Sequence, residues 1–206
     1  MAEAASAART LLLVIDIQVD FASPHGAMGR CGLDLSGVET MIDRTQTLVA
    51  AARDAGVPVG FARVVTAPET DPRALRLLHA RTGRDASAAA ICREGTAGAD
   101  YYRLRPQPGD LEIAKRLYSC FVGTELADFL AARGIDTLVV AGMTTECCVD
   151  STVRDAFHRD LNVFVAADAC IAYSEAAHVH ALAALGSSCA VLVASDTVLA
   201  GWAYRG

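Results

Sequence analysis

Short apolar runs alternate with segments of helical periodicity along most of this chain, and that alternation limits what the chain can fold into. Leu11 to Ile17 is an apolar run with Asp16 near its end, and such runs suit strands covered on both faces of a parallel sheet. Val38 to Ala55 then carries apolar residues at helical spacing and stops at Gly56, a common residue after a helix. Because Val57 to Val65 is apolar again, the chain is predicted to begin as a right-handed βαβ unit.

The same alternation resumes after residue 109 and continues almost to the end of the chain. One helix is predicted to start with Thr124 as its N-cap, and another to run from Ser174 as its N-cap through Ala184. Between them, the apolar residues from Val149 to Phe157 recur at helical spacing and predict a further helix. We therefore expect one domain over residues 1–206, a three-layer α/β/α fold around a mainly parallel six-stranded sheet. The later strands are predicted at Leu111–Ala114 (ending at Lys115), Thr137–Ala141, Val163–Ala166 (reaching Asp168) and Ala190–Val193.

Residues 66–109 break the alternation and form a connection rich in Pro, Gly, Ala and Arg, with one short helix expected from Pro72 to Ala80. A connection this long is usually functional, so we expect an insertion that acts as a lid or an oligomer contact. Its arginines could orient an anionic substrate group, although solvated positions or salt bridges between subunits are the ordinary role of exposed charges. These are Arg73, Arg76, Arg81, Arg84, Arg93, Arg103 and Arg105.

The composition argues against several classes of function. The hydrophobic share of 53% and charged share of 20% describe a globular chain, and the net charge of −6 disfavours binding to nucleic acid or anionic membranes. No apolar run is long enough to span a bilayer, and no secretory leader is recognisable. Seven scattered cysteines without a CxxC pair indicate reduced thiols, so we expect a cytoplasmic protein. Residues 1–9 are mostly small, and we expect them to form a disordered tail.

One stretch, Gly134 to Phe157, combines a strand, a glycine, a polar turn and a helix. The turn ends in Cys147 and Cys148, so a thiol is expected near the amino end of a helix. Free backbone N–H groups and the helix dipole at such a position lower the pKa of a cysteine and make it a better nucleophile. The alternative is that two small apolar side chains simply pack beneath the turn.

Three reactive side chains, Asp16, Lys115 and Cys148, stand just past predicted strands, where a parallel sheet gathers its active site. Taken singly, Asp16 could cap a turn and Lys115 could be a solvated surface lysine. Taken together they make chemical sense. Asp16 can accept the proton of Cys148 and return it to a leaving amine, while Lys115 holds the carboxylate and stabilises the thiolate.

Two histidines, His178 and His180, lie two positions apart on the helix that Ser174 starts. Side chains at that spacing point to different faces of a helix. We therefore predict no metal site there.

Three motifs in order resemble the isochorismatase-like cysteine hydrolases over roughly Leu11 to Val193. Each motif alone would be a weak signal, whereas their order along the chain is specific. They are DIQVDF from Asp16 to Phe21, the set Lys115, Tyr118, Ser119, Phe121 and Thr124, and GMTTECCVDSTVRDAF from Gly142 to Phe157.

The resemblance implies roles for individual residues. It places the nucleophile six residues after Gly142 and directly before a valine, which selects Cys148 over Cys147. It implies a cis peptide between Met143 and Thr144, and an oxyanion hole made by the backbone N–H groups of Thr144 and Cys148. It also implies the strand order 3-2-1-4-5-6 and a substrate pocket lined by Phe21 and Tyr118.

One departure from the family pattern narrows the expected activity. Nicotinamidases of this family carry an Asp/His metal cluster after the second strand, where this chain has FARVVTAPETDP without a histidine. We therefore expect no metal and no cofactor. The segments ASPHG and RPQPGDLEIAKRLYSCF instead resemble ureidoacrylate and other N-carbamoyl amide hydrolases.

The resulting hypothesis is a metal-independent cysteine amidohydrolase that cleaves a C–N bond of a small amide or ureido substrate. The family also implies a homo-oligomer, a dimer or a tetramer. Two alternatives remain open: hydrolysis of a vinyl ether with Asp16 as the acid, and a non-catalytic family member that acts as a binding protein.

Overall fold

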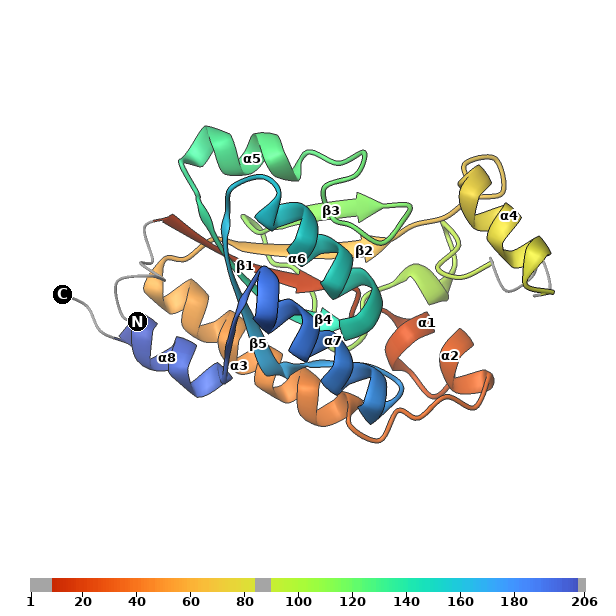
Figure 1. Cartoon of the computed structure of the whole chain (residues 1–206), viewed down its shortest axis with the longest axis horizontal. Helices are drawn as coiled ribbons and strands as arrows, with labels where there is room; N and C mark the ends of the chain where they lie inside the picture. The colour runs from red at the N-terminus through yellow and green to blue at the C-terminus, as the bar shows by residue number, and fades with distance from the viewer. Residues whose placement is uncertain (1–8, 84–89, 204–206) are drawn as a thin grey trace.

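The sheet at the centre of the fold carries the architecture that the sequence predicts. The computed structural model of the chain describes residues 9–83 and 90–203, and within them six strands form one sheet in the order β3-β2-β1-β4-β5-β6. Every neighbouring pair is parallel, so the α/β prediction and the strand order are confirmed. The strands are β1 (Thr10–Ile15), β2 (Val59–Val64), β3 (Leu111–Lys115), β4 (Thr137–Met143), β5 (Asn162–Ile171) and β6 (Val191–Val193) (Figure 1).

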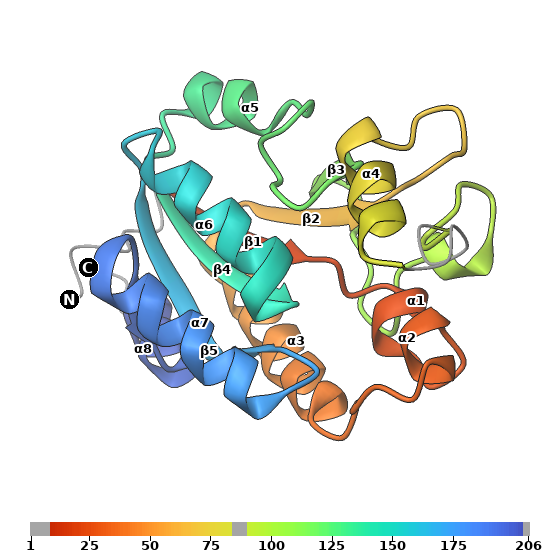
Figure 2. The same ribbon diagram turned by 45° about the vertical axis from the view of Figure 1, so that its right-hand side comes forward.

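Helices cover both faces of the sheet, as an all-parallel sheet requires. On one face lie α3 (Val38–Ala55) and α8 (Ser195–Ala203). On the other lie α5 (Leu126–Arg133), α6 (Asp150–Phe157) and α7 (Glu175–Ser188) (Figures 1 and 2). The result is three layers, helix on sheet on helix.

Strand β1 shows why its sequence is continuously apolar. Leu12 and Val14 pack into the cluster beneath α3 and α8, whereas Leu11 and Leu13 pack into the cluster beneath α5, α6 and α7. These four side chains are at most 1% exposed, because alternate residues of a strand face opposite sides of the sheet. Strand β1 is therefore the hydrophobic centre of the molecule.

Two strands are longer than the sequence predicts, for one shared reason. The pairing of β4 with β5 shifts register between Val140 and Gly142 and then resumes, with Gly142 opposite Cys170 and Met143 opposite Ile171. The apolar pattern breaks at this irregularity, so the prediction ended β4 at Ala141 and β5 at Ala166. Asp168 consequently lies inside β5 rather than past its end.

Several helix boundaries also differ from the prediction. Thr124 is not the N-cap of α5, which begins at Leu126 after Glu125; the Thr124 hydroxyl instead donates to the Cys120 carbonyl. The Ser174 cap is confirmed, since its hydroxyl accepts from Ala177 N–H, although α7 runs on to Ser188. The sequence analysis missed α8 and three short helices, α1 (Val19–Ala22), α2 (Ala27–Arg30) and η3 (Ala97–Ala99).

The insertion at residues 66–109 leaves the carboxyl end of β2, and its last residues return to the start of β3 at Leu111. It contains α4 (Arg73–Arg81), one residue later than predicted (Figure 2). Some of its arginines are paired within the chain: Arg93 binds Asp71 in a two-pronged contact at 2.6 and 2.7 Å, and Arg103 binds Glu39 and Asp43. Arg84 and most of the tail expected at residues 1–9 fall outside the described residues.

Gly142, near the end of β4, packs against the backbone of its partner Ile15 at the end of β1. Its φ is +119°, and a Cβ added there would stand 2.1 Å from the Ile15 carbonyl oxygen. Only glycine adopts this conformation without strain. The atoms that an added Cβ would meet belong to the Ile15 backbone, which is held in β1 and cannot move aside. The glycine thus sets the approach of the two strands whose ends carry Asp16 and the cysteine turn.

Replacing Gly142 by alanine should destabilise the protein by more than about 2 kcal/mol, because both the dihedral angle and the contact with Ile15 are unfavourable. Urea unfolding measures the loss. Gly201→Ala is the matched control, since nothing lies within 4 Å of its added Cβ and it sits in α8, where alanine favours the helix by about 1 kcal/mol. Equal stabilities of the two variants would contradict this account.

Candidate active site

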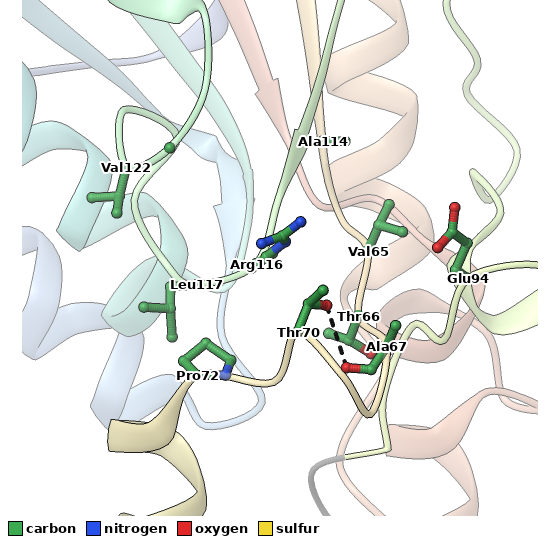
Figure 3. A pocket seen from close by; sticks show the side chains of 11 residues that line it. Val65, Thr66, Ala67, Thr70, Pro72, Glu94, Ala114, Arg116, Leu117 and Val122 are labelled. Carbon is green, nitrogen blue, oxygen red and sulfur yellow. Dashed lines mark hydrogen bonds between the residues drawn. The ribbon is translucent and has the colours of Figure 1, made fainter.

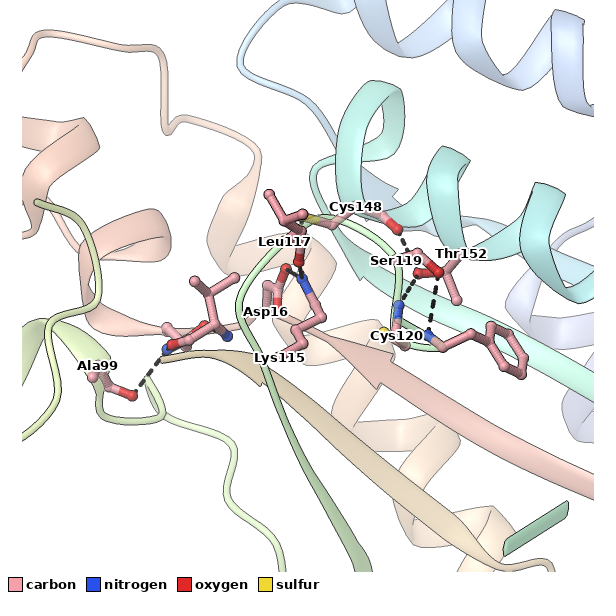
Figure 4. A network of polar contacts seen from close by, with 11 residues as sticks. Asp16, Ala99, Lys115, Leu117, Ser119, Cys120, Cys148 and Thr152 are labelled. Carbon is pink, nitrogen blue, oxygen red and sulfur yellow. Dashed lines mark hydrogen bonds and ion pairs between the residues drawn. The ribbon is translucent and has the colours of Figure 1, made fainter. Parts of the chain in front are cut away.

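Three side chains from different strands meet at the carboxyl edge of the sheet. Asp16 follows β1, Lys115 ends β3, and Cys148 lies in the turn after β4 (Figure 4). The structure therefore brings together the three residues that the sequence analysis singled out. Their placement agrees with the rule that ligands of open parallel sheets bind at the strands' carboxyl ends.

Lys115 is the hub of this arrangement. Its Nζ donates to Asp16 Oδ2 at 2.7 Å, to the Leu117 carbonyl at 3.0 Å and to Cys148 Sγ at 3.4 Å. An ammonium group has three N–H donors, so each has a partner. The side chains of Lys115 and Asp16 are 0% and 1% exposed, which rules out the reading of Lys115 as a solvated surface lysine.

Asp16 has an unusual backbone conformation, with φ +54°. Its N–H donates to the Ala62 carbonyl on β2, and its own carbonyl accepts from Gln18 N–H at 2.8 Å. The carboxylate binds Lys115 through Oδ2, so it does not serve as a turn cap. Oδ1 is buried and, among the described residues, has no hydrogen-bond partner, which leaves it able to accept a proton.

Gln18 holds the turn after Asp16 in place, a role that the sequence analysis missed. Its side-chain amide donates to the carbonyls of Val64 at 2.8 Å and Ala99 at 2.9 Å and accepts from Val64 N–H at 2.7 Å. Gln18 is fully buried, so these bonds tie β1, β2 and the insertion together. The available signal was a glutamine between the apolar residues Ile17 and Val19, directly after the first strand.

The turn that carries Cys148 is not the start of a regular α-helix. Residues Thr145–Val149 form one π-helical turn in which Cys147 and Val149 N–H groups donate to the Thr144 carbonyl at 3.1 and 3.2 Å. The α6 helix begins only at Asp150. Single π-turns of this kind are frequent at functional sites. The peptide between Met143 and Thr144 is cis, as the resemblance implies.

The ionisation of this site differs from the prediction. A hydrogen bond with the neighbouring Cys147 thiol, burial and the Asp16 charge raise the pKa of the Cys148 thiol, against the opposing effect of Lys115. The expected lowering of its pKa by a helix terminus is therefore wrong. Two N–H groups of the turn are instead bound to the Thr144 carbonyl, and the sulfur is buried.

The two charged partners respond to the same environment. Burial raises the pKa of Asp16 above its usual range, although the charge of Lys115 and the contact with Cys148 oppose the shift. Burial alone would lower the pKa of Lys115, but Asp16, Cys148 and Cys120 together outweigh this effect, so the pKa of the lysine is raised. The site thus holds an ammonium ion next to a carboxylate that readily takes a proton.

Cys147 has more contact with the site than packing alone. Its side chain is partly exposed and packs against the cluster beneath α6. The hydrogen bond with Cys148 lowers the pKa of Cys147. Proximity to the other thiol therefore does not identify the nucleophile, whereas the contact with Lys115 favours Cys148.

The two predicted pocket residues are placed differently. Phe21 is partly buried against the core, and its carbonyl accepts from the Tyr173 hydroxyl at 3.0 Å. Tyr118 lies in the loop after β3 and is 41% exposed. Their contact with a substrate, like the role of Thr144 in an oxyanion hole, stays a prediction.

An open cavity of about 590 Å³ lies beside the carboxyl edge of the sheet, between the ends of β2 and β3 and the insertion (Figure 3). Arg116, Thr70 and Glu94 are among its lining residues. Lys115 itself is not among the lining residues, although Ala114 and Arg116 on either side of it are. The cavity therefore adjoins the three site residues without including them.

Within residues 9–83 and 90–203, no three His, Cys, Asp or Glu side chains are grouped so as to hold a metal ion. His178 contacts Thr145, while His180 is exposed. No helix in these ranges has the length and apolar character needed to cross a membrane.

Comparison with known sequences identifies relatives of the chain. The profile of the isochorismatase domain matches residues 10–197. The ureidoacrylate amidohydrolase RutB of Methylobacterium radiotolerans is 38% identical over 172 residues, which cover 79% of this chain and 67% of that protein.

Solved structures with the same fold include two enzymes. A cysteine hydrolase from Pseudomonas syringae pv. phaseolicola superimposes with a TM-score of 0.85 at 26% identity, over 96% of this chain and 94% of that one. An N-carbamoylsarcosine amidase from Thermoplasma acidophilum superimposes with a TM-score of 0.72 at 26% identity, over 91% and 97% of the two chains. The sequence motifs and the fold thus point to the same group of proteins.

Replacing Lys115 by methionine should destabilise the protein by about 3–5 kcal/mol, because the buried Asp16 carboxylate loses its counter-ion. The double variant Asp16→Asn/Lys115→Met should be more stable than Lys115→Met, since no buried charge is left unpaired. Urea unfolding measures both.

Arg154→Met is the control, because the Arg154 side chain is 43% exposed and its pair with Asp150 should contribute less than about 1 kcal/mol. A Lys115→Met variant no less stable than this control would show that the buried pair is not required for folding.

Proposed function

The chain belongs to the isochorismatase family, and from this premise we propose that it is a metal-independent cysteine amidohydrolase acting on a small amide or ureido substrate. The names of its relatives, an ureidoacrylate amidohydrolase and an N-carbamoylsarcosine amidase, support cleavage of a C–N bond. The observation that carries the proposal is the buried contact of Lys115 with both Asp16 and Cys148.

Proton transfer from Cys148 to Asp16 is the first proposed step. Asp16 Oδ1 is free to accept the proton, and its raised pKa makes it a stronger base than an ordinary aspartate. Lys115 then lies 3.4 Å from the sulfur and balances the charge of the new thiolate. A positioned base of this kind contributes on the order of 100-fold or more to the rate.

The thiolate then attacks the carbonyl carbon of the substrate, forming a C–S bond while the oxygen becomes an anion. We assign the oxyanion hole to the backbone N–H groups of Thr144 and Cys148. The C–N bond breaks as protonated Asp16 gives its proton to the departing ammonia or amine. Water then cleaves the thioester, or the thiocarbamate if the substrate is a ureido acid, and Cys148 regains its proton.

A second candidate uses the same residues without covalent chemistry. Asp16 with a raised pKa could protonate a vinyl ether as a general acid, the kind of reaction for which the family is named. That reaction needs no thiol. Covalent capture of substrate by Cys148 therefore separates the two functions.

Replacing Cys148 by alanine should lower kcat by at least about 1,000-fold, since the nucleophile is lost. Replacing Cys147 by alanine should keep kcat within about fivefold of the wild-type value, because Cys147 forms no bond to the substrate in the proposed mechanism. Steady-state ammonia release measures both. Equal losses in the two variants would contradict the assignment of Cys148.

The substrate class is tested with the wild-type protein and a panel of small ureido acids, carbamoyl amino acids, biuret, maleamate and nicotinamide. We expect ammonia release from ureido or carbamoyl substrates and a mass increase on Cys148 when the reaction is quenched with acid. No ammonia release from any member of the panel, together with hydrolysis of a vinyl ether that is retained in the Cys148→Ala variant, would favour the second candidate instead.

A further inference from the structure

One polar contact to the cysteine turn comes from outside the three site residues. The Thr145 hydroxyl oxygen lies 2.8 Å from Nδ1 of His178, which is on the first turn of α7. Thr145 is fully buried, and His178 is partly buried. The sequence analysis considered His178 only as a metal ligand, and the proposed reaction does not use it.

The position of Thr145 makes this contact relevant to Cys148. Thr145 opens the π-helical turn and follows Thr144, whose carbonyl accepts from Cys147 and Val149 N–H groups. At the other end of the turn, the Cys148 carbonyl accepts from the Thr152 hydroxyl at 2.7 Å. The contact with His178 therefore anchors the beginning of the turn, as Thr152 anchors its end.

The same part of the chain also holds the opposite side of the site. Tyr173, five residues before His178, donates from its hydroxyl to the Phe21 carbonyl at 3.0 Å. The segment from the end of β5 to the first turn of α7 thus contacts both α1, which follows Asp16, and the turn of Cys148.

From this geometry we propose that His178 is a positioning residue for the nucleophile: through Thr145 it holds the cysteine turn so that Cys148 Sγ stays beside Lys115. The inference rests on the proposed role of Cys148. A displacement of about 1 Å from a reactive geometry can cost on the order of 100-fold in rate, so one buried side-chain contact is enough to matter.

The state of the imidazole fits this role. Burial lowers the pKa of His178, although the charges of Glu146 and Glu175 oppose the shift. A neutral ring has one acceptor nitrogen, which can accept a hydrogen bond from the Thr145 hydroxyl. The contact is then a neutral hydrogen bond that persists at neutral pH.

The test uses two measurements on the full chain, ammonia release and the rate at which iodoacetamide alkylates Cys148. Alkylation is followed by the mass of the peptide that contains Cys148, in a Cys147→Ala background, so that the signal comes from one thiol and the exposed Cys31 does not contribute to it. We expect His178→Ala to lower kcat by about 5- to 50-fold with KM within about threefold, and to change the alkylation rate at least threefold. His178→Asn, whose amide can occupy the place of Nδ1, should restore both values to within about threefold of the parent.

Three further variants test whether the effect runs through Thr145. Thr145→Val should change kcat and the alkylation rate as His178→Ala does, whereas Thr145→Ser keeps the hydroxyl and should leave both values near those of the parent. The Thr145→Val/His178→Ala double variant should lose no more activity than the more damaged single variant. His180→Ala, on the same helix but exposed, should leave kcat and alkylation unchanged.

Three results would overturn the proposal: unchanged kcat and alkylation in His178→Ala, failure of His178→Asn to restore activity in a folded protein, or multiplicative losses in the double variant. Melting temperatures identify variants that fail to fold. The alkylation rate needs no turnover, so it tests the positioning of Cys148 even if Cys148→Ala should prove that the thiol is not the nucleophile.

Discussion

The buried ion pair of Lys115 and Asp16 is the interaction on which the site depends. Both side chains are almost completely inaccessible to water, and removing two charges from water costs several kcal/mol for each ion. Such a pair is tolerated only where its remaining hydrogen bonds are made and the surrounding core is strong. Here the Leu117 carbonyl and Cys148 Sγ accept the remaining two hydrogen bonds of the Lys115 ammonium group, and two hydrophobic clusters enclose the sheet.

The parallel sheet brings these charges together through its register. Lys115 pairs with Val64 on β2, and Val64 is bound through both its N–H and its carbonyl by the side chain of Gln18. Gln18 in turn donates its backbone N–H to the Asp16 carbonyl. One buried glutamine therefore links the end of the edge strand to the turn that carries the carboxylate. The distance between Lys115 and Asp16 is set by this chain of contacts as much as by their own attraction.

The features that could be predicted from the sequence are those with a local pattern. Apolar runs mark the strands, and reactive side chains directly after them mark the edge at which Asp16, Lys115 and Cys148 meet. The shift between β4 and β5 could not be predicted, because it depends on pairing between distant segments. The same holds for Gln18 and for the contact of His178 with Thr145. The raised pKa of Cys148 was missed because local position near a helix says nothing about burial or about two N–H groups committed to Thr144.

The raised pKa values of Asp16 and Cys148 are compatible with a reactive thiol when the charges are counted. A resting site with Asp16 ionised and Cys148 protonated holds one negative charge beside Lys115. Passing the proton from sulfur to carboxylate keeps that number at one, so burial does not oppose the transfer as it opposes loss of the proton to water. A second negative charge would have only Lys115 to balance it in a buried environment. The site therefore favours an internal exchange of the proton over a free thiolate, and the same proton is then at hand for the departing amine.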